Sequence, residues 1–486
     1  MSPTVASNPG RRARHNLCNL GSRSCFFILC LFLAFPTPSS QASALGKRDL
    51  VHLSSSALSS IIAHPDPVKN IDSTNPSSHL SKILIPRVPD TENNTAVRQY
   101  IVSTLTQLNW HIEEDSFTDS TPYGEKRFTN VIATKDPRAP RRVIVAAHFD
   151  SKFFSTFPQN QFVGATDSAA PCAFMLDLAE ALNPMLDKRL RRITRRDDED
   201  DDDDDDDDDD EDEDDDLMDT TLQFVFFDGE EAFKDWTATD SIYGARHLAQ
   251  KWATTHVQPN AKRRLLPLKQ INEIAGIEQL ILLDLLGSVR PLIRSSFSST
   301  GWLFDAMVSA ETRLAEMGAF VYDGDGATTK DKWTSFFMPR TGLANLGFIE
   351  DDHIPFLRLG VDILHVIANP FPTVWHTIKD DASALDIPTM RRWNLILRVL
   401  MCEYLGLRVE DLEDKRSPTN GRSHSELVSL AITGIGRIAH RSVVHHHNPW
   451  SFPALSALSL SVVKHTSRYH AQDGVGIVYL PKASEE

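Results

Sequence analysis

Short apolar runs alternate with longer segments through the middle of the chain, and this alternation is the strongest constraint on its fold. Each run has the length of a strand and is apolar almost throughout; the runs are Val143–Ala147, Leu222–Phe227, Leu280–Leu286 and Ile363–Ile367. Strands buried on both faces belong to parallel sheets that helices cover on both sides. The sequence therefore predicts an α/β protein, a three-layer α/β/α sandwich around a mixed, mostly parallel central sheet.

Helical periodicity and turn signals place further elements around these strands. Apolar residues recur at helical spacing up to Trp110, which predicts a leading helix. A turn at Pro122–Gly124 separates two extended stretches, the second of which is Phe128–Thr134. Ser168 is expected to cap the helix that follows the first apolar run, and the last clear helix should span about Thr389 to Tyr404.

The N-terminus has the order of a secretory signal peptide: arginines, then the apolar run Cys25–Phe35, then small residues. A helix of that length rises only about 16 Å, about half a bilayer core, so a membrane anchor is the weaker alternative. We therefore expect a signal peptide or anchor at 1–44, a polar segment at 45–95, a folded domain at 96–408 and a tail at 409–486.

Twenty consecutive acids, residues 197–216, dominate the charge of the 486-residue chain, whose formal net charge is −17. Without them, 50 basic residues face 47 acidic ones, a net charge of +3. The folded part is thus nearly neutral, and its composition argues neither for a nucleic-acid binder nor for a strongly acidic surface. Because such a run cannot bury apolar surface, residues 189–218 are predicted to form a disordered insertion.

Cysteines and one glycosylation sequon are the features of the mature chain that bear on covalent modification. Only Cys172 and Cys402 lie outside the targeting segment, so the chain is no disulfide scaffold. Asn93 opens the glycosylation sequon Asn-Asn-Thr, which has meaning only in a chain that enters the secretory pathway. The expected location is accordingly the secretory pathway, either secreted or in the lumen of the Golgi or endoplasmic reticulum.

Carboxylates and histidines occur where the predicted strands end, and the carboxyl ends of parallel strands form one ligand-binding rim. They are His148, Asp150, Asp167, Glu230, Glu231, Asp284 and His376. Each of them alone has an ordinary structural explanation, but a buried rim with so many ionisable groups needs a compensating cation. Oxygen and nitrogen ligands suit catalytic zinc, and in the pair Glu230 and Glu231 one carboxylate can bind metal while the other serves as a base.

Several segments resemble glutaminyl cyclase, an enzyme of the zinc aminopeptidase superfamily. They follow one another in consistent order over about residues 75–407 and are Ala147–Lys152, Gly164–Ser168, Phe227–Phe233, Leu282–Gly287, Asp351–Phe356 and Trp375–Thr377. The superfamily's di-zinc exopeptidases share most of this pattern. The segments Asp351–Phe356 and Trp375–Thr377 are the ones that favour the cyclase.

The resemblance implies an acyltransferase, a glutaminyl-peptide cyclotransferase that converts N-terminal glutamine into pyroglutamate and releases ammonia. It implies one zinc ion per chain, bound by Asp167, Glu231 and His376. It also implies that the substrates are peptides or proteins with N-terminal glutamine, or glutamate. A monomer without nucleic-acid partners and without a stable membrane span is expected.

The resemblance further assigns the groups around the metal. Glu230 would shuttle the proton, and Asp284 with Asp351 would complete a hydrogen-bonded acid network. Three aromatic residues would wall the pocket for the glutamine side chain: Trp236, Phe371 and Trp375. One departure is Ala147, which stands where animal cyclases commonly have a cysteine bridged to the equivalent of Cys172, so Cys172 is expected to be free.

Two other functions stay open at this point. A di-zinc aminopeptidase would use His148 and Asp284 for a second metal, with Glu230 activating water. An inactive relative that serves as a binding protein would lack the metal. A zinc count separates all three possibilities.

Overall fold

The computed structural model describes the chain from residue 47 to residue 415 with gaps; the described residues are 47, 49–199, 219–256, 272–320, 333–340 and 349–415. All of them belong to one compact unit, Met1–Ser417. The expected signal peptide, most of the acidic run and nearly all of the expected tail lie outside the described residues. Within the part that is described, no helix combines the length and the apolar character needed to cross a membrane.

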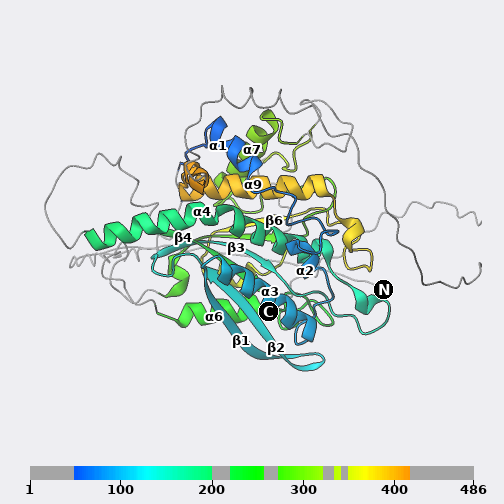
Figure 1. The fold of residues 1–486 in the computed structure, drawn as a ribbon. Coiled ribbons are helices and arrows are strands. Elements are labelled where there is room, and N and C mark those ends of the chain that lie inside the picture. The colour runs from blue at the N-terminus through cyan, green and yellow to red at the C-terminus, as the bar shows by residue number, and fades with distance from the viewer. Residues whose placement is uncertain are drawn as a thin grey trace, which may run out of the picture. The chain divides into compact units, whose positions relative to one another are not determined.

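Six strands form one mixed sheet in the order β1-β2-β4-β3-β5-β6 (Figure 1). Their bounds are β1 His111–Thr121, β2 Gly124–Thr134, β3 Arg141–His148, β4 Thr220–Phe227, β5 Ile277–Asp284 and β6 Ile363–Ile367. The hairpin β1–β2 is antiparallel and joins β4 through an antiparallel pair, whereas β4, β3, β5 and β6 are parallel. The predicted strands and the mostly parallel sheet are confirmed.

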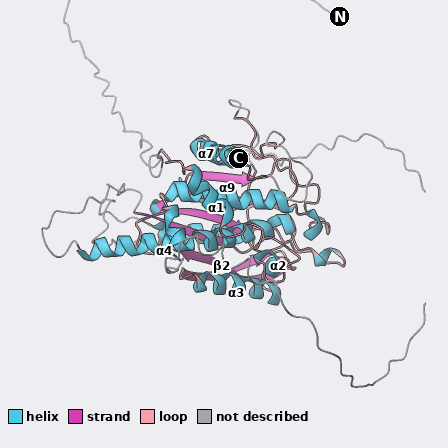
Figure 2. Cartoon of the chain, turned by 45° about the horizontal axis from the view of Figure 1, so that its top comes forward, coloured by secondary structure: helices cyan, strands magenta, loops and turns pink. Residues whose placement is uncertain are grey.

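Helices cover both faces of the sheet, as the two views show (Figures 1 and 2). One face packs against the large core that holds α1 Ser55–Ala63, α2 His79–Ile83, α3 Glu92–Gln107, α4 Ala170–Glu199, α7 Gly301–Glu316 and α9 Ile387–Leu405. The other face packs against α6 Tyr243–Thr254 and α8 Ile354–Arg358. Short turns complete the chain: η2 Gln159–Gln161, η3 Ala165–Ala169, η4 Glu273–Gly276, η5 Ala382–Ala384 and η6 Val409–Lys415.

Strand β3 shows why the runs are apolar throughout. Val143 and Val145 point into the core under α4 and α9, while Ile144 and Ala146 point into the core under α6. Because side chains alternate between the faces of a strand, a strand at the centre of a three-layer sandwich needs apolar residues at every position. The α/β/α fold class predicted from the sequence is therefore confirmed.

Two expected boundaries differ from the structure. The segment 45–95 is not merely a polar leader to the domain, because Leu58 of α1 and Leu80 of α2 are buried in the main core. The predicted insertion 189–218 also begins too early, because α4 continues to Glu199 and buried Arg189 donates to the Thr220 carbonyl at 3.0 Å. The folded unit is thus longer at both places than the composition suggested.

Candidate active site

The ends of the strands bring the expected residues to one rim. His148 ends β3, Asp284 ends β5, and Glu230 and Glu231 follow β4 after a tight turn at Gly229. Gly229 has φ +83°, and a Cβ there would meet the Phe128 ring at 2.5 Å, so the turn that presents the two glutamates requires glycine.

Three side chains from different segments form a cluster of potential metal ligands: Asp167, Glu231 and His376. His376 Nε2 lies 3.5 Å from Asp167 Oδ2 and 3.4 Å from Glu231 Oε1. Both oxygens are buried, and neither accepts a hydrogen bond from the residues that the structure describes. Ligands at the corners of a tetrahedron, about 2.0–2.1 Å from zinc, are about 3.4 Å apart. The spacing and the unsatisfied oxygens therefore fit a metal ion held by these three residues.

The second oxygen of each carboxylate in this cluster is held by the protein. His148 Nε2 lies 3.0 Å from Asp167 Oδ1, and Lys152 Nζ donates to Glu231 Oε2 at 3.1 Å. Each carboxylate is thus fixed with its free oxygen turned toward His376. Lys152 belongs to one of the segments that resemble the cyclase, but no sequence pattern predicts this contact.

The electrostatics of the cluster favour positive charge. Burial would lower the pKa of His376, but the carboxylates of Glu231 and Asp167 outweigh it and raise the pKa to about 9. Burial would likewise raise the pKa of Asp167, yet the hydrogen bond with His148 and the nearby charge of His376 hold it below the ordinary range. The cluster therefore favours a positive charge, and a proton on His376 is the simplest one.

Glu230 is held differently from its neighbour. Asp150 accepts the backbone N–H groups of Glu230 at 3.1 Å and of Glu231 at 3.3 Å, which fixes the backbone of the pair. Burial, followed by the nearby charges of Glu231 and Asp351, raises the pKa of the Glu230 carboxyl well above its usual value, against the opposing effect of His148. A carboxyl with a raised pKa can both accept and donate a proton near neutral pH.

Asp284 lies beside the same cluster. Its Oδ1 accepts the hydroxyl of Ser168 and lies 3.5 Å from His148 Nε2. Burial and the neighbouring Asp351 raise the pKa of Asp284 to about 6. Ser168 does not cap the following helix as expected, because it lies inside the turn η3 that runs directly into α4 and not at the residue before a free helix start.

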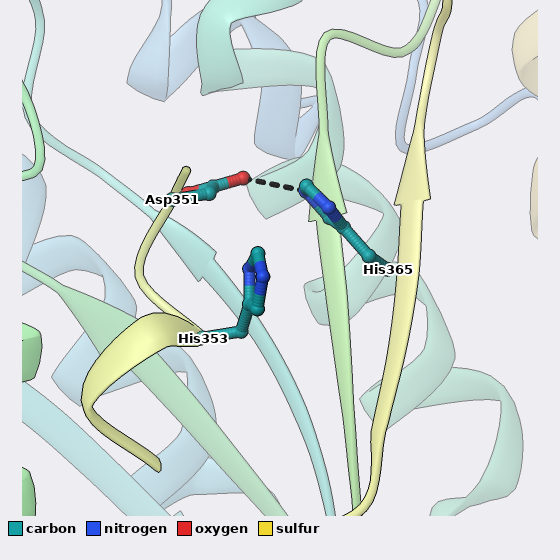
Figure 3. Close-up of side chains that lie close together, drawn as sticks. All are labelled: Asp351, His353 and His365. Carbon is teal, nitrogen blue, oxygen red and sulfur yellow. Dashed lines mark hydrogen bonds and ion pairs between the residues drawn. The ribbon is translucent and has the colours of Figure 1, made fainter. Parts of the chain in front are cut away.

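Asp351 forms the far side of the rim together with two histidines (Figure 3). His365 Nε2 lies 2.7 Å from Asp351 Oδ2, and this hydrogen bond lowers the pKa of Asp351 although burial alone would raise it. The His353 and His365 rings lie 4.5 Å apart. His365 was not expected from the sequence, although a lone polar residue inside the apolar strand β6 was a usable signal.

Two further clusters of potential metal ligands lie at the rim, namely His148–Asp167–Asp284 and Asp351–His353–His365. In the first, Asp284 Oδ1 already accepts the Ser168 hydroxyl. In the second, Asp351 and His365 are 2.7 Å apart, which is a hydrogen bond and closer than two ligands of one zinc ion. Of the three clusters among the described residues, Asp167, Glu231 and His376 alone combine the spacing of zinc ligands with carboxylate oxygens that accept no hydrogen bond.

The predicted aromatic residues border this site from two sides. Trp375 stacks on His376 with 3.8 Å between ring centroids, and Phe371 lies 4.9 Å from Trp375. Trp236 is 40% exposed, and its indole N–H donates to Glu350 at 3.4 Å, next to Asp351 in the chain. Trp375 thus contacts His376 directly, Phe371 packs on Trp375, and Trp236 is hydrogen-bonded to the segment that leads into Asp351.

Comparison with known proteins decides the family. A model described as Peptidase family M28 matches residues 130–401. The glutaminyl-peptide cyclotransferase of Bos taurus is 39% identical over 330 residues, covering 68% of this chain and 81% of that protein. That of Drosophila melanogaster is 41% identical over 328 residues, covering 67% of this chain and 79% of that protein. This chain belongs to the glutaminyl-peptide cyclotransferase family.

A solved structure agrees with this membership. The glutaminyl cyclase of Macrostomum lignano superposes with a TM-score of 0.58 at 34% identity, covering 76% of this chain and 98% of that one. The resemblance expected from the sequence is confirmed, and glutaminyl-peptide cyclotransferases are acyltransferases. The aminopeptidase alternative has less support than the cyclotransferase.

The expected free cysteine is also observed. Cys172 is buried without a disulfide partner, and its thiol donates to the His148 carbonyl at 3.2 Å. Burial raises the pKa of this thiol to about 12, so it stays protonated as a donor at neutral pH. A weak hydrogen bond thus supports His148 in this member of the cyclotransferase family.

Proposed function

We propose that this cyclotransferase-family member closes N-terminal glutamine into pyroglutamate at a single zinc site held by Asp167, Glu231 and His376. The observation that carries this proposal is the pair of buried carboxylate oxygens without hydrogen bonds beside His376. Zinc bound there would polarise the side-chain amide carbonyl of the substrate. One open position at such a site is enough for that carbonyl oxygen.

Glu230 performs the proton transfers in this proposal. The α-amine of the substrate attacks its own side-chain amide carbon, the new C–N bond closes a five-membered ring, and the bond to the amide nitrogen breaks. Glu230 takes one proton from the attacking amine and returns one to the departing nitrogen, which leaves as ammonia. The raised pKa of Glu230 suits both transfers. No water molecule is consumed.

Asp284 and Asp351 support this transfer as part of one acid network. The Asp284 carboxyl accepts the hydroxyl of Ser168, and Asp351 is fixed by its hydrogen bond to His365. Their negative charge also contributes to the raised pKa of neighbouring acids, since Asp351 raises the pKa of both Glu230 and Asp284. We assign them a supporting part in catalysis on this basis.

Trp236, Phe371 and Trp375 wall the pocket for the glutamine side chain. Because nucleophile and electrophile belong to one residue, the pocket must hold the ring-forming conformer and exclude water. Phe371 and Trp375 pack together beside His376, which suits this task.

The remaining parts of the proposal concern the setting of the reaction. The substrates are peptides and proteins with N-terminal glutamine or glutamate, and the enzyme is a monomer. A signal peptide at residues 1–44 directs it to the secretory pathway, where it is secreted or kept in the lumen of the Golgi or endoplasmic reticulum. Asn93 is exposed at the start of α3, so a glycan can attach to it there.

Mass spectrometry of a peptide that begins with glutamine tests the reaction. Incubation with the purified protein should reduce the peptide mass by one ammonia molecule. Loss of the whole N-terminal residue would instead establish the aminopeptidase alternative, for which the cluster His148–Asp167–Asp284 offers the second metal site. A Glu230→Gln sample prepared in parallel controls for spontaneous cyclisation.

A further inference from the structure

The loop that connects β4 to α6 carries both glutamates and one of the aromatic residues. Glu230 and Glu231 open it, Trp236 lies in its middle, and Tyr243 begins α6 at its end. Apart from a bridge between Thr237 and Asp240, the loop has no regular secondary structure. Its shape must therefore come from side-chain contacts to its backbone.

Asp240 supplies those contacts for the middle of the loop. It is 5% exposed, and its Oδ1 accepts the Phe233 N–H at 2.9 Å and the Tyr243 hydroxyl at 2.7 Å. Its Oδ2 accepts the N–H groups of Lys234 at 2.9 Å and Asp235 at 3.0 Å. Hydrogen bonds to an ionised carboxylate are about twice as strong as neutral ones. One side chain thus binds the three consecutive backbone amides that precede Trp236.

Two carboxylates divide the loop between them. Asp150 holds the amides of Glu230 and Glu231, and Asp240 holds the amides from Phe233 to Asp235. The glutamate half is also closed at its base, where Ile242 N–H donates to the Glu230 carbonyl at 2.8 Å. The position of the glutamates therefore does not depend on Asp240, whereas the backbone leading to Trp236 does.

We propose that Asp240 is a positioning residue that sets the place of Trp236 and, through it, the fit of the glutamine side chain in the pocket. This inference rests on the proposed function, in which Trp236 walls that pocket. Trp236 is 40% exposed, and within the described part of the chain its one polar contact is the 3.4 Å hydrogen bond to Glu350. Its own packing is thus weak, and the fixed backbone before it does most of the positioning.

Asp240→Asn tests the proposal with little change in side-chain volume. The asparagine side chain has one acceptor oxygen instead of two. Its NH₂ group would therefore face a backbone N–H that Asp240 accepts, and that hydrogen bond would be lost. Asp240→Asn should raise KM about tenfold, while zinc content and kcat change little. This is less than the roughly 10²-fold loss that a misplacement of about 1 Å can cause. A merely structural residue would lower the melting temperature without this rise in KM.

A double-mutant cycle with Trp236→Ala identifies the route of the effect. In the Trp236→Ala background, Asp240→Asn should raise KM less than about twofold, because the group that it positions is gone. An unchanged KM in Asp240→Asn, or an equal rise in both backgrounds, would overturn the proposal. Asp136→Asn is the matched control, since Asp136 is a buried loop carboxylate that accepts a backbone N–H at the opposite edge of the sheet. Its KM should match wild type.

A fluorescence measurement keeps the test independent of the reaction. Acrylamide quenching of each protein, minus that of its Trp236→Phe version, reports the accessibility of the Trp236 indole. The indole should be more accessible in Asp240→Asn than in wild type, and equal accessibility would contradict the proposal. If wild type fails to cyclise glutamine peptides, the proposed function fails while quenching still decides the role of Asp240. If Asp240→Asn does not fold, Tyr243→Phe removes one of the four hydrogen bonds and should shift both readouts in the same direction.

Discussion

Charged side chains are paired differently at the two ends of the parallel strands. At the edge where β3 and β5 begin, buried or half-buried acids face basic side chains; the pairs are Arg141–Glu278, Arg142–Glu273 and Lys135–Asp187. At the rim, where these strands end, Asp167 Oδ2 and Glu231 Oε1 accept no hydrogen bond from the described residues. The acids at the first end are thus paired with basic side chains of the protein, whereas Asp167 and Glu231 each keep one oxygen without a hydrogen bond from the described residues.

This difference separates stability from chemistry within one fold. A paired edge loses folding free energy when one partner is removed, because the remaining charge is buried alone. Buried carboxylate oxygens without hydrogen bonds are costly unless a metal ion or substrate compensates them, so substitutions at the rim should change metal content and rate before they change stability. The predictions below test each side of this contrast.

The largest effect is expected from removal of a metal ligand. His376→Ala should lose bound zinc and reduce kcat by at least about 10⁴-fold, the upper range for a single acid–base group, because polarisation of the substrate is lost as well. Elemental analysis and steady-state kinetics measure both. Full zinc occupancy in this variant would remove His376 from the ligand set.

A smaller loss of rate with intact metal is expected for Glu230→Gln. The amide keeps the size of the side chain but not its basicity, so kcat should fall about 10²- to 10⁴-fold while KM and zinc content stay close to wild type. Glu231→Gln is the matched control, because weakening a ligand should lower zinc content too. A near-wild-type kcat in Glu230→Gln would transfer the proton shuttle to Asp284 or Asp351.

At the paired edge, Arg141→Met should destabilise the fold and leave the chemistry intact. Arg141 Nε lies 3.3 Å from Glu278 Oε1, and both side chains are buried. Leaving Glu278 without this partner should cost about 3 kcal/mol of unfolding free energy, with zinc content unchanged. Arg138→Met, at a more exposed pair 3.8 Å apart, should cost less than about 1 kcal/mol in the same denaturant titration. Equal costs for the two variants would contradict the assignment of a buried pair.

The smallest effect is expected for Glu180, a carboxylate away from the rim, and it concerns the dependence of stability on pH. The hydrogen bond from His79 lowers the pKa of Glu180 to about 2 from its ordinary value of 4.5, against the opposing effect of burial. Because the folded pKa is the lower one, the stabilisation is fully present above pH 4.5 and is lost as the pH falls toward 2. The stability difference between wild type and Glu180→Gln should therefore shrink in acid. A difference independent of pH would show that charge is not its source.

Much of this arrangement could be predicted from the sequence because the rim residues directly follow apolar strands. His148 and Asp284 end two of these strands, and Glu230 follows a third, so their meeting is a consequence of a parallel sheet. The family resemblance then separated ligand from base within the pair Glu230 and Glu231. Their assigned roles stay predictions.

The contacts that position the rim could not be predicted in the same way. Asp240 and Lys152 act through hydrogen bonds to backbone or carboxylate atoms, and no periodicity in the sequence reports such partners. The boundary at residue 189 was wrong for a related reason: the basic block before the acidic run looked solvated, yet Arg189 and Ile193 are buried on α4. Local composition described the charge of that segment and not the core beneath it.

The number of bound zinc ions and their positions decide whether the chain holds a single metal ion at Asp167, Glu231 and His376. Crystals of the purified protein, measured at the zinc absorption edge, should show one anomalous peak per chain, between Asp167 Oδ2, Glu231 Oε1 and His376 Nε2. A peak within His148–Asp167–Asp284 or within Asp351–His353–His365, or two peaks at the rim, would contradict a single zinc ion held by Asp167, Glu231 and His376.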